Sequence, residues 1–194
     1  MRAEHMADDL GRVAADRPDG TAFLPVDHDD VALITFTGSP EVGWSIRARA
    51  PRKRVGLELG NNAPVIIEPS GDWATAAAKI SVAGFSHAGQ SCISTQRIYV
   101  HHDIIDRFTE ALVPKVEALG AKVLAGGELD GSVLAPTVLS GVTPDMEVCR
   151  SEVFGPVVAI IGYDDFSDAV AQANDTRYGL QAAVFTAELD VAMR

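Results

Sequence analysis

Two residues that support nucleophilic catalysis stand beside turns in this chain. Cys92 ends the polar segment that starts at Gly89, a setting in which a thiol can be exposed and its backbone N–H left free. Glu58 lies in an apolar run that starts at Val55 and is followed by the turn residue Gly60. A thiolate is the reactive form of cysteine, and a carboxylate can act as a general base. The pair therefore indicates thiol-dependent catalysis.

Each of these residues also has a purely structural interpretation. A single cysteine is more often a small buried hydrophobe than a nucleophile, and strand alternation can simply direct Glu58 to solvent. Cys149 lacks a glycine-rich frame, so we expect it to be structural. The histidines His87, His101 and His102 leave a Cys/His hydrolase as an alternative, although no spacing among them selects it.

The composition is that of a folded globular protein. Of the 194 residues, 47% are hydrophobic and 22% are charged, which provides a core and argues against disorder. The net charge of −11 argues against a nucleic-acid or anionic-membrane partner. No apolar run approaches the ~18 residues that span a bilayer, and no leader pattern opens the chain, so we expect a cytoplasmic protein. Without a CxxC motif, the two cysteines predict neither a disulfide framework nor a metal site.

The elements that position Cys92 and Glu58 are predicted to form an α/β sheet. Short apolar runs of strand length alternate with segments of helical length, which is typical of a sheet with helices on its faces. We expect the strand that carries Glu58 to be buried on both faces. The predicted strands cover residues 31–36, 54–59, 63–67, 96–101, 122–124, 136–138, 157–162 and 182–185, and the predicted helices cover 1–15, 40–49, 72–87, 103–119 and 166–174.

The junction between the predicted strand 31–36 and the predicted helix 40–49 has the residues of a phosphate-binding turn. Gly38 precedes Ser39, a good N-cap, and Pro40 suits the first helical position. Backbone N–H groups at a helix start bind phosphate, but most such junctions are only caps. The basic residues from Arg47 to Arg54 complement the dipole at the end of the same helix.

Four segments, in order along the chain, resemble the signature motifs of the aldehyde dehydrogenase superfamily. They are Phe36 to Ser39, Leu57 to Gly60, Gly89 to Cys92, and Glu152 to Val157. The sequence from Asn174 to Thr186 resembles the segment that follows, so the resemblance covers residues 29–194. Gly43-Trp44 and Gln90 to Ser94 resemble the branch that contains lactaldehyde and non-phosphorylating glyceraldehyde-3-phosphate dehydrogenases.

The resemblance implies an NAD(P)-dependent oxidoreductase that converts a small aldehyde into a carboxylic acid. Cys92 would attack the aldehyde to give a thiohemiacetal, which becomes a thioester as NAD or NADP is reduced. Glu58 would activate the water that releases the acid, and the backbone N–H of Cys92 would be an oxyanion donor. The resemblance assigns cofactor contacts to Gly38, Ser39, Leu59, Glu152 and Phe154.

The same resemblance divides the chain at about residue 60. Residues 1–60 correspond to a remnant of the NAD(P)-binding domain, and residues 61–194 to an open-sheet α/β catalytic domain that carries the thiol. Relatives have a long connection where Leu119 here runs directly into Gly120, and they continue beyond Arg194. An upstream asparagine and a lysine that relatives use for the oxyanion and the adenine ribose have no counterpart, so we expect weakened cofactor binding.

Three hypotheses therefore stay open. The first is an aldehyde oxidation centre that works alone or is completed by a partner chain. The second is a family fragment that keeps the fold without turnover. The third is a cofactor-independent thioesterase or esterase that uses Cys92 and Glu58. A shortened chain that exposes sheet edges also predicts self-association.

Overall fold

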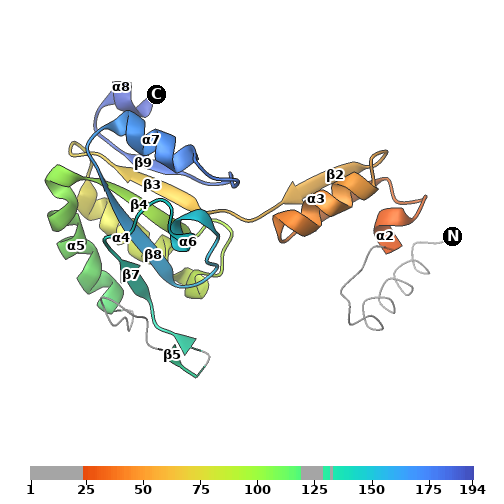
Figure 1. Ribbon diagram of the computed structural model, residues 1–194, viewed down its shortest axis with the longest axis horizontal. Coiled ribbons are helices and arrows are strands. Elements are labelled where there is room, and N and C mark those ends of the chain that lie inside the picture. Colours follow the sequence, from red (N-terminus) through yellow and green to blue (C-terminus); the bar gives the residue numbers. More distant parts are fainter. Residues whose placement is uncertain (1–23, 119–128, 132) are drawn as a thin grey trace. The chain divides into compact units, whose positions relative to one another are not determined.

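The computed structural model describes residues 24–118, 129–131 and 133–194, which belong to two compact units that meet in sequence at Gly60 and Asn61 (Figure 1). The helix expected over residues 1–15, the strand expected over 122–124 and the junction at 119–120 lie outside the described residues.

The first unit is a strand-helix-strand motif. Strands β1 and β2 pair in parallel, with Thr37 opposite Glu58 at their last pair. Helix α3 covers one face of the pair, and the Ser39 side chain caps its first turn by accepting from the Val42 N–H at 3.4 Å. The bounds are α2(Leu24–Asp27), β1(Leu33–Thr37), α3(Pro40–Arg49) and β2(Arg54–Glu58).

Strand β2, which carries Glu58, is half-exposed within this unit, so the prediction of burial on both faces was wrong. Exposed and half-buried residues alternate along β2. Val55 packs into the small core under α3, whereas Gly56 and Glu58 are exposed. The physical reason is that a sheet of two strands with one helix has only one covered face.

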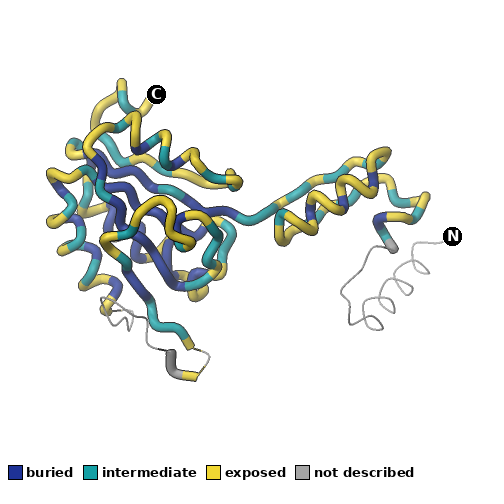
Figure 2. Tube along the Cα trace, in the orientation of Figure 1, coloured by how far each residue is buried: buried dark blue, intermediate teal, exposed yellow. Residues whose placement is uncertain are grey.

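The second unit is built on a five-stranded parallel sheet, in the order β7-β8-β4-β3-β9. Its central strands are almost entirely buried, as expected for a parallel sheet that is covered on both faces (Figure 2). The bounds are β3(Ala63–Ile67), β4(Thr95–His101), β7(Thr137–Leu139), β8(Val157–Tyr163) and β9(Ala183–Phe185).

Helices cover both faces of this sheet (Figure 1). On one face, α4 and α5 pack around Ile80, Phe108 and Leu112, which are at most 2% exposed. On the other face, α6 and α7 pack around Cys149 and Ala169. The bounds are α4(Trp73–Ala83), η1(Ser86–Gly89), η2(His102–Ile104), α5(Ile105–Glu117), β5(Leu129–Asp130), β6(Val133–Leu134), α6(Glu147–Arg150), α7(Phe166–Asn174) and α8(Leu189–Ala192).

The predicted α/β class is confirmed, with one notable change next to the thiol. The alanine-rich helix ends at Ala83 rather than near His87. Gly84 is packed so closely that an added Cβ would lie 2.7 Å from a methyl of Val158, and His87 has a left-handed backbone (φ 53°) that no α-helix accommodates. The helix expected from residue 103 starts at Ile105, after a short 3₁₀ turn. None of the helices in the described ranges is both long and apolar enough to cross a bilayer.

Candidate active site

Cys92 lies in the turn that leads into β4, at the amino end of the second unit's sheet. Its side chain is half-buried and its thiol is unpaired. The turn is closed by the Ser94 N–H, which donates to the Ser91 carbonyl at 2.9 Å. The Ser94 hydroxyl lies 3.2 Å from the carbonyl oxygens of both Ala83 and Gly84, which ties the turn to the end of α4.

The backbone N–H of Cys92 is available to a ligand. Among the residues that the structure describes, no acceptor is hydrogen bonded to it. A backbone N–H beside a nucleophilic sulfur is the kind of donor that stabilises an oxyanion at the carbon under attack. The turn therefore offers both groups that thiol addition to a carbonyl requires.

Gly89 docks the Cys92 turn onto a distant part of the chain. His87, Ala88 and Gly89 form a left-handed run, with φ of 53°, 57° and 69°. A Cβ added at Gly89 would lie 2.0 Å from the carbonyl oxygen of Gly155, so only glycine fits this position. The segment with Cys92 and the segment with Glu152 and Phe154 are thus packed against each other.

Glu152 is held by two hydrogen bonds and keeps one carboxylate oxygen available. Its Oε1 accepts from the Asn61 N–H at 3.0 Å, and its own N–H donates to the Tyr178 hydroxyl at 3.3 Å. Within the described residues, Oε2 of Glu152 has no hydrogen-bond partner. Phe154, two residues on, has a left-handed backbone (φ 49°) and is 48% exposed. A half-buried carboxylate beside an exposed ring suits a ligand with hydroxyl groups and a flat ring.

The remaining predicted site residues lie in the first unit. The Gly38 N–H donates to the Glu58 carbonyl at 3.1 Å, so the phosphate-type turn and Glu58 share the carboxyl edge of β1 and β2. The Leu59 side chain lies over α3, where a Cβ added at Gly43 would be 2.4 Å from its Cδ2. Gly38, Ser39, Glu58 and Leu59 thus form one group, and Cys92, Glu152 and Phe154 form another in the second unit.

Several residues that surround the second group were not identified from the sequence. Asn61 and Asn62 were given no role in the sequence analysis, yet Asn61 binds Glu152 and Asn62 is fully buried. Tyr178 and Arg97 had no assigned role. The one available signal was Arg97 itself, a charged residue inside the apolar strand run that ends at His101.

Cys149 has the surroundings of a structural thiol. It is 3% exposed and packs in the core beneath α6 and α7. Burial raises the pKa of the Cys149 thiol, which disfavours the thiolate and hence nucleophilic reactivity.

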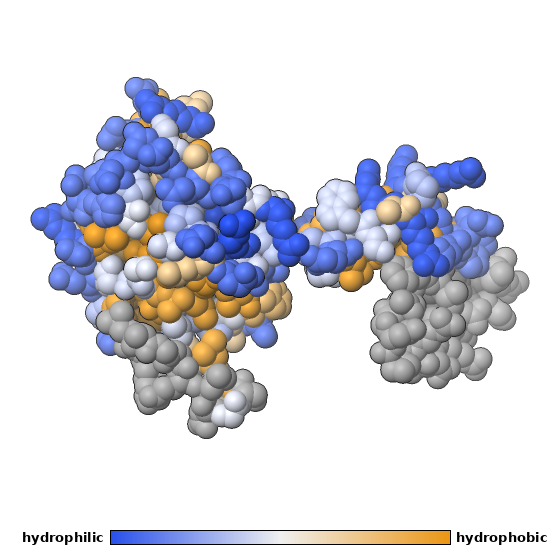
Figure 3. Space-filling view, in the orientation of Figure 1, coloured by the Kyte–Doolittle hydropathy of each residue, from blue (hydrophilic) through white to orange (hydrophobic). Residues whose placement is uncertain are grey.

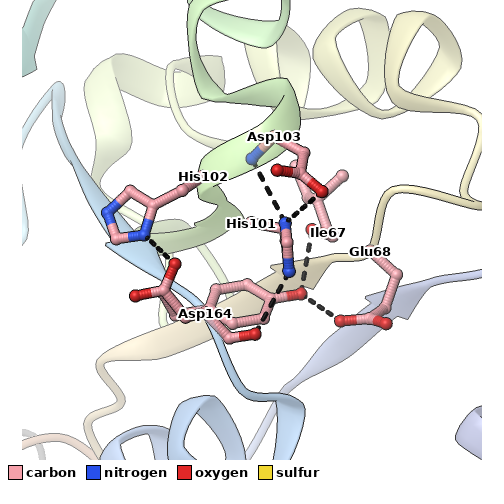
Figure 4. A network of polar contacts seen from close by, with 7 residues as sticks. Ile67, Glu68, His101, His102, Asp103 and Asp164 are labelled. Carbon is pink, nitrogen blue, oxygen red and sulfur yellow. Dashed lines mark hydrogen bonds and ion pairs between the residues drawn. The ribbon is translucent and has the colours of Figure 1, made fainter.

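A second polar cluster lies at the opposite, carboxyl edge of the same sheet (Figure 4). The Tyr163 hydroxyl is 3.0 Å from the Ile67 carbonyl oxygen and also hydrogen bonds to the Glu68 carboxylate. Burial, followed by the contact with Glu68, raises the pKa of Tyr163. The Asp164 carboxylate accepts a hydrogen bond from His102 Nδ1 at 2.7 Å. These contacts join the ends of β3, β4 and β8, whereas Cys92 lies at their other ends.

The aldehyde dehydrogenase family model matches this chain over residues 16–120 and 115–194. The 3-sulfolactaldehyde dehydrogenase of Priestia megaterium is 41% identical over 203 residues, a match that covers 87% of this chain and 43% of that relative. An NAD-dependent aldehyde dehydrogenase from Sinorhizobium meliloti is 31% identical with a TM-score of 0.82, over 98% of this chain and 48% of that one.

An NADP complex is also among the similar solved structures. The NADP-dependent glyceraldehyde-3-phosphate dehydrogenase from Bacillus halodurans is 31% identical with a TM-score of 0.81, over 87% of this chain and 42% of that one. The chain spans less than half the length of each of these three relatives. The match of the family model over most of the sequence confirms the resemblance carried by the four motifs: this chain belongs to the aldehyde dehydrogenase family.

Proposed function

We propose that this chain carries the thiol centre of an NAD(P)-dependent aldehyde dehydrogenase, which oxidises an aldehyde to a carboxylic acid. The observation that supports this most is the contact between Gly89 and Gly155, where an added Cβ would be 2.0 Å from the carbonyl oxygen. This contact packs the turn that carries Cys92 against the segment that carries Glu152 and Phe154. Membership of the family supplies the reaction class.

Cys92 is the proposed nucleophile. Its thiolate sulfur adds to the aldehyde carbon, and the carbonyl oxygen becomes an oxyanion that accepts a hydrogen bond from the Cys92 backbone N–H. The product of this step is a thiohemiacetal on Cys92. Loss of a hydride from its carbon converts the thiohemiacetal to a thioester.

The residues present fit a dinucleotide. The start of α3, a ten-residue helix, provides the positive dipole end that a phosphate prefers next to Gly38 and Ser39. The Ser39 oxygen accepts from the Val42 N–H and keeps its own O–H for donation to a phosphate oxygen. NAD or NADP, when bound, takes up the hydride that leaves the substrate carbon.

The nicotinamide half of the dinucleotide would be held by other residues. We assign the ribose hydroxyls to Oε2 of Glu152, which has no hydrogen-bond partner in the described part of the chain. The exposed ring of Phe154 would pack on the nicotinamide ribose or ring, and the Leu59 carbonyl would face the nicotinamide.

Glu58 is the proposed general base for product release. Its carboxylate takes a proton from water, the water oxygen adds to the thioester carbon, and the Cys92 thiolate leaves. One aldehyde, one water and one oxidised cofactor thus give one acid, one reduced cofactor and one proton. The exposed position of Glu58 at the end of β2 supports a role that requires access to water.

A small 2-hydroxyaldehyde is the substrate class that we favour. The names of two of the relatives refer to 3-sulfolactaldehyde and glyceraldehyde-3-phosphate. Both molecules are three-carbon 2-hydroxyaldehydes that carry an anionic group at the third carbon. Lactaldehyde itself has the same aldehyde and hydroxyl carbons without the anionic group, so the two kinds of substrate can be compared directly.

The domain assignment belongs to the same proposal. Residues 1–60 would be what is present of the NAD(P)-binding domain, and residues 61–194 the catalytic domain. The family model matches in two segments that meet at residues 115–120, which supports a shortened connection at 119–120. The unpaired Cys92 and Cys149 suit a reducing compartment such as the cytoplasm.

Self-association or a partner chain is a further part of the proposal. Figure 3 shows apolar side chains over a continuous area on the visible face of the second unit. In the first unit, Leu33 and Trp44 are both 59% exposed. Exposed apolar area of this kind favours association with another chain.

Cofactor titration tests the proposed function. NAD and NADP are added while the fluorescence of Trp44 and Trp73 and the melting temperature are followed, and aldehyde oxidation is then measured with lactaldehyde. We expect a saturable change with one of the two cofactors and slow turnover that Cys92→Ala removes. The absence of any change at millimolar cofactor would contradict the dehydrogenase assignment for this chain and favour a family fragment without turnover.

A cofactor-independent esterase or thioesterase is the second candidate function. It is favoured by the position of Cys92 and its backbone N–H, which has no acceptor in the described part of the chain, in one turn of one unit. Hydrolysis of p-nitrophenyl acetate by the wild type, Cys92→Ala and Cys149→Ala separates the possibilities. Equal rates in the wild type and Cys92→Ala would mean that the thiol is not a working nucleophile, and Cys149→Ala serves as the control thiol.

A further inference from the structure

Arg97 is a fully buried cation at the centre of the second unit, 1% exposed on strand β4. Its Nε and Nη2 donate to the Asn62 carbonyl at 3.1 and 2.9 Å. Nη2 also donates to the Ala173 carbonyl at 2.9 Å, and Nη1 donates to the Gln172 carbonyl at 3.2 Å and the Tyr99 hydroxyl at 3.1 Å. These bonds use every N–H of the guanidinium, and each acceptor is uncharged.

A buried guanidinium without a carboxylate partner is costly unless all its donors are satisfied. Here the compensation comes partly from α7, because Gln172 and Ala173 lie in its last turn, where the carbonyls carry the negative end of the helix dipole. A lysine has three donors on a single nitrogen and cannot reproduce the planar fork. The site therefore requires arginine. Two of the five hydrogen bonds of Arg97 go to the carbonyl of Asn62.

Hydrogen bonds from Asn62 connect the Arg97 site to the segment that contains Glu152. Its side-chain amide donates to the Cys149 carbonyl at 3.0 Å and to the Ser151 carbonyl at 3.2 Å. Its N–H donates to Oδ1 of Asn61 at 2.9 Å. The Asn61 N–H in turn donates to Oε1 of Glu152 at 3.0 Å. The Asn62 side chain therefore fixes the backbone next to Glu152, and the bonds through Asn61 fix the Glu152 carboxylate.

We propose that Arg97 is a positioning residue, which acts through the Asn61–Asn62 turn to hold the Glu152 carboxylate so that Oε2, which has no partner among the described residues, can accept from a ligand hydroxyl. This rests on the proposed function only in naming the cofactor ribose as that ligand. Arg97 does not contact the ligand itself. If Arg97 only filled the core, its replacement would lower stability without changing how Glu152 is held.

Arg97→Lys is the central variant, because it keeps the charge and most of the volume while losing the forked donors. Asn62→Ala is the second variant, because it keeps the carbonyl that Arg97 binds and removes both side-chain donors to Cys149 and Ser151. Val116→Ala is the matched control. The hydrogen-bonded chain from Arg97 through Asn62 and Asn61 to Glu152 is called the relay. Val116 is 0% exposed on α5, on the opposite face of the sheet from α7, so its truncation lowers stability without touching the relay.

The first measurement requires no cofactor. By NMR, the chemical shift of the Asn61 amide proton is compared with and without the substitution Glu152→Gln, in each background and at one pH. In the wild type and Val116→Ala, we expect Glu152→Gln to move the Asn61 resonance, because the Asn61 N–H is hydrogen bonded to the Glu152 carboxylate. In Arg97→Lys and Asn62→Ala, we expect at least half of that movement to be lost. Movement of wild-type size in both variants would overturn the proposal.

The second measurement connects the relay to the cofactor. Glu152→Gln and Arg97→Lys should each weaken NAD or NADP binding about tenfold, the usual effect of losing one hydrogen bond to a charged group. The double variant should be no weaker than either single variant, because both act on one contact. Wild-type affinity in Arg97→Lys, with weakened affinity in Glu152→Gln, would contradict the relay. If the wild type binds no cofactor, the proposed function fails for this chain, and the Asn61 measurement still decides the role of Arg97.

Discussion

Replacing Gly89 by alanine tests the packing that joins the Cys92 turn to the Glu152 segment. A Cβ at this position would lie 2.0 Å from the Gly155 carbonyl oxygen and 2.8 Å from the Pro156 nitrogen. Carbon–oxygen contacts are ordinarily about 3.3 Å, so the two turns would have to separate by roughly 1 Å. These neighbours are backbone atoms, and no side-chain rotation relieves the contact.

The loss in free energy of unfolding has two parts. Gly89 has φ of 69°, a conformation that costs alanine about 1 kcal/mol, and overpacking adds about 1–3 kcal/mol. We therefore expect Gly89→Ala to lose about 2–4 kcal/mol. Gly141→Ala is the matched control, because Gly141 has φ of 66° and no neighbour within 4 Å of an added Cβ. Its expected loss is about 1 kcal/mol.

Urea unfolding gives the free energies, and the rate of Cys92 acylation by p-nitrophenyl acetate reports on the site. A misplacement of about 1 Å typically costs about 10²-fold in rate, so we expect that loss in Gly89→Ala and wild-type acylation in Gly141→Ala. If the two glycine variants have the same stability and the same acylation rate, the turns are not in contact and the reasoning about the site is refuted.

Three further predictions follow from burial and exposure. In the native protein, the Cys92 thiol should react rapidly with Ellman's reagent, and the buried Cys149 thiol should react only on unfolding. Rapid reaction of both thiols would contradict the assigned burial. The raised pKa of Tyr163 means that the fold favours the neutral phenol, so its contribution to stability is present below the unfolded pKa of about 10 and is lost as pH rises above it. Urea midpoints measured at increasing alkaline pH should therefore fall less steeply in Tyr163→Phe, and parallel curves would show that Tyr163 is not responsible. Light scattering should detect self-association, because β9 is an edge strand and Val184 is 44% exposed, whereas a monodisperse monomer would count against it.

Much of the second unit and helix α3 of the first unit could be predicted from local patterns. The helix over Pro40–Arg49 has its predicted bounds because Ser39 and Pro40 specify a start in the sequence itself. The strand Ala63–Ile67 and the helix Phe166–Asn174 also have their predicted bounds, since their apolar runs are bordered by turn residues. These signals act over a few residues and require no knowledge of distant contacts.

The parts that the sequence did not predict depend on contacts between distant residues. The Asn61–Glu152 bond joins residues 91 positions apart, and no local pattern marks it. The end of α4 at Ala83 and the left-handed backbone of His87 accompany the packing of Gly89 on Gly155, which is equally remote in sequence. The role of Arg97 also requires the end of α7 to be in place.

On the proposed function, Cys92 forms an acyl thioester when an aldehyde is oxidised. Mass spectrometry of the chain quenched in acid after incubation with lactaldehyde and NAD or NADP tests this most directly. We predict an acyl adduct on the peptide that contains Cys92, formed only when aldehyde and oxidised cofactor are both present, accumulating in Glu58→Gln and absent in Cys92→Ala. An adduct on Cys149, an adduct that forms without cofactor, or no adduct in Glu58→Gln would contradict the roles assigned to Cys92 and Glu58.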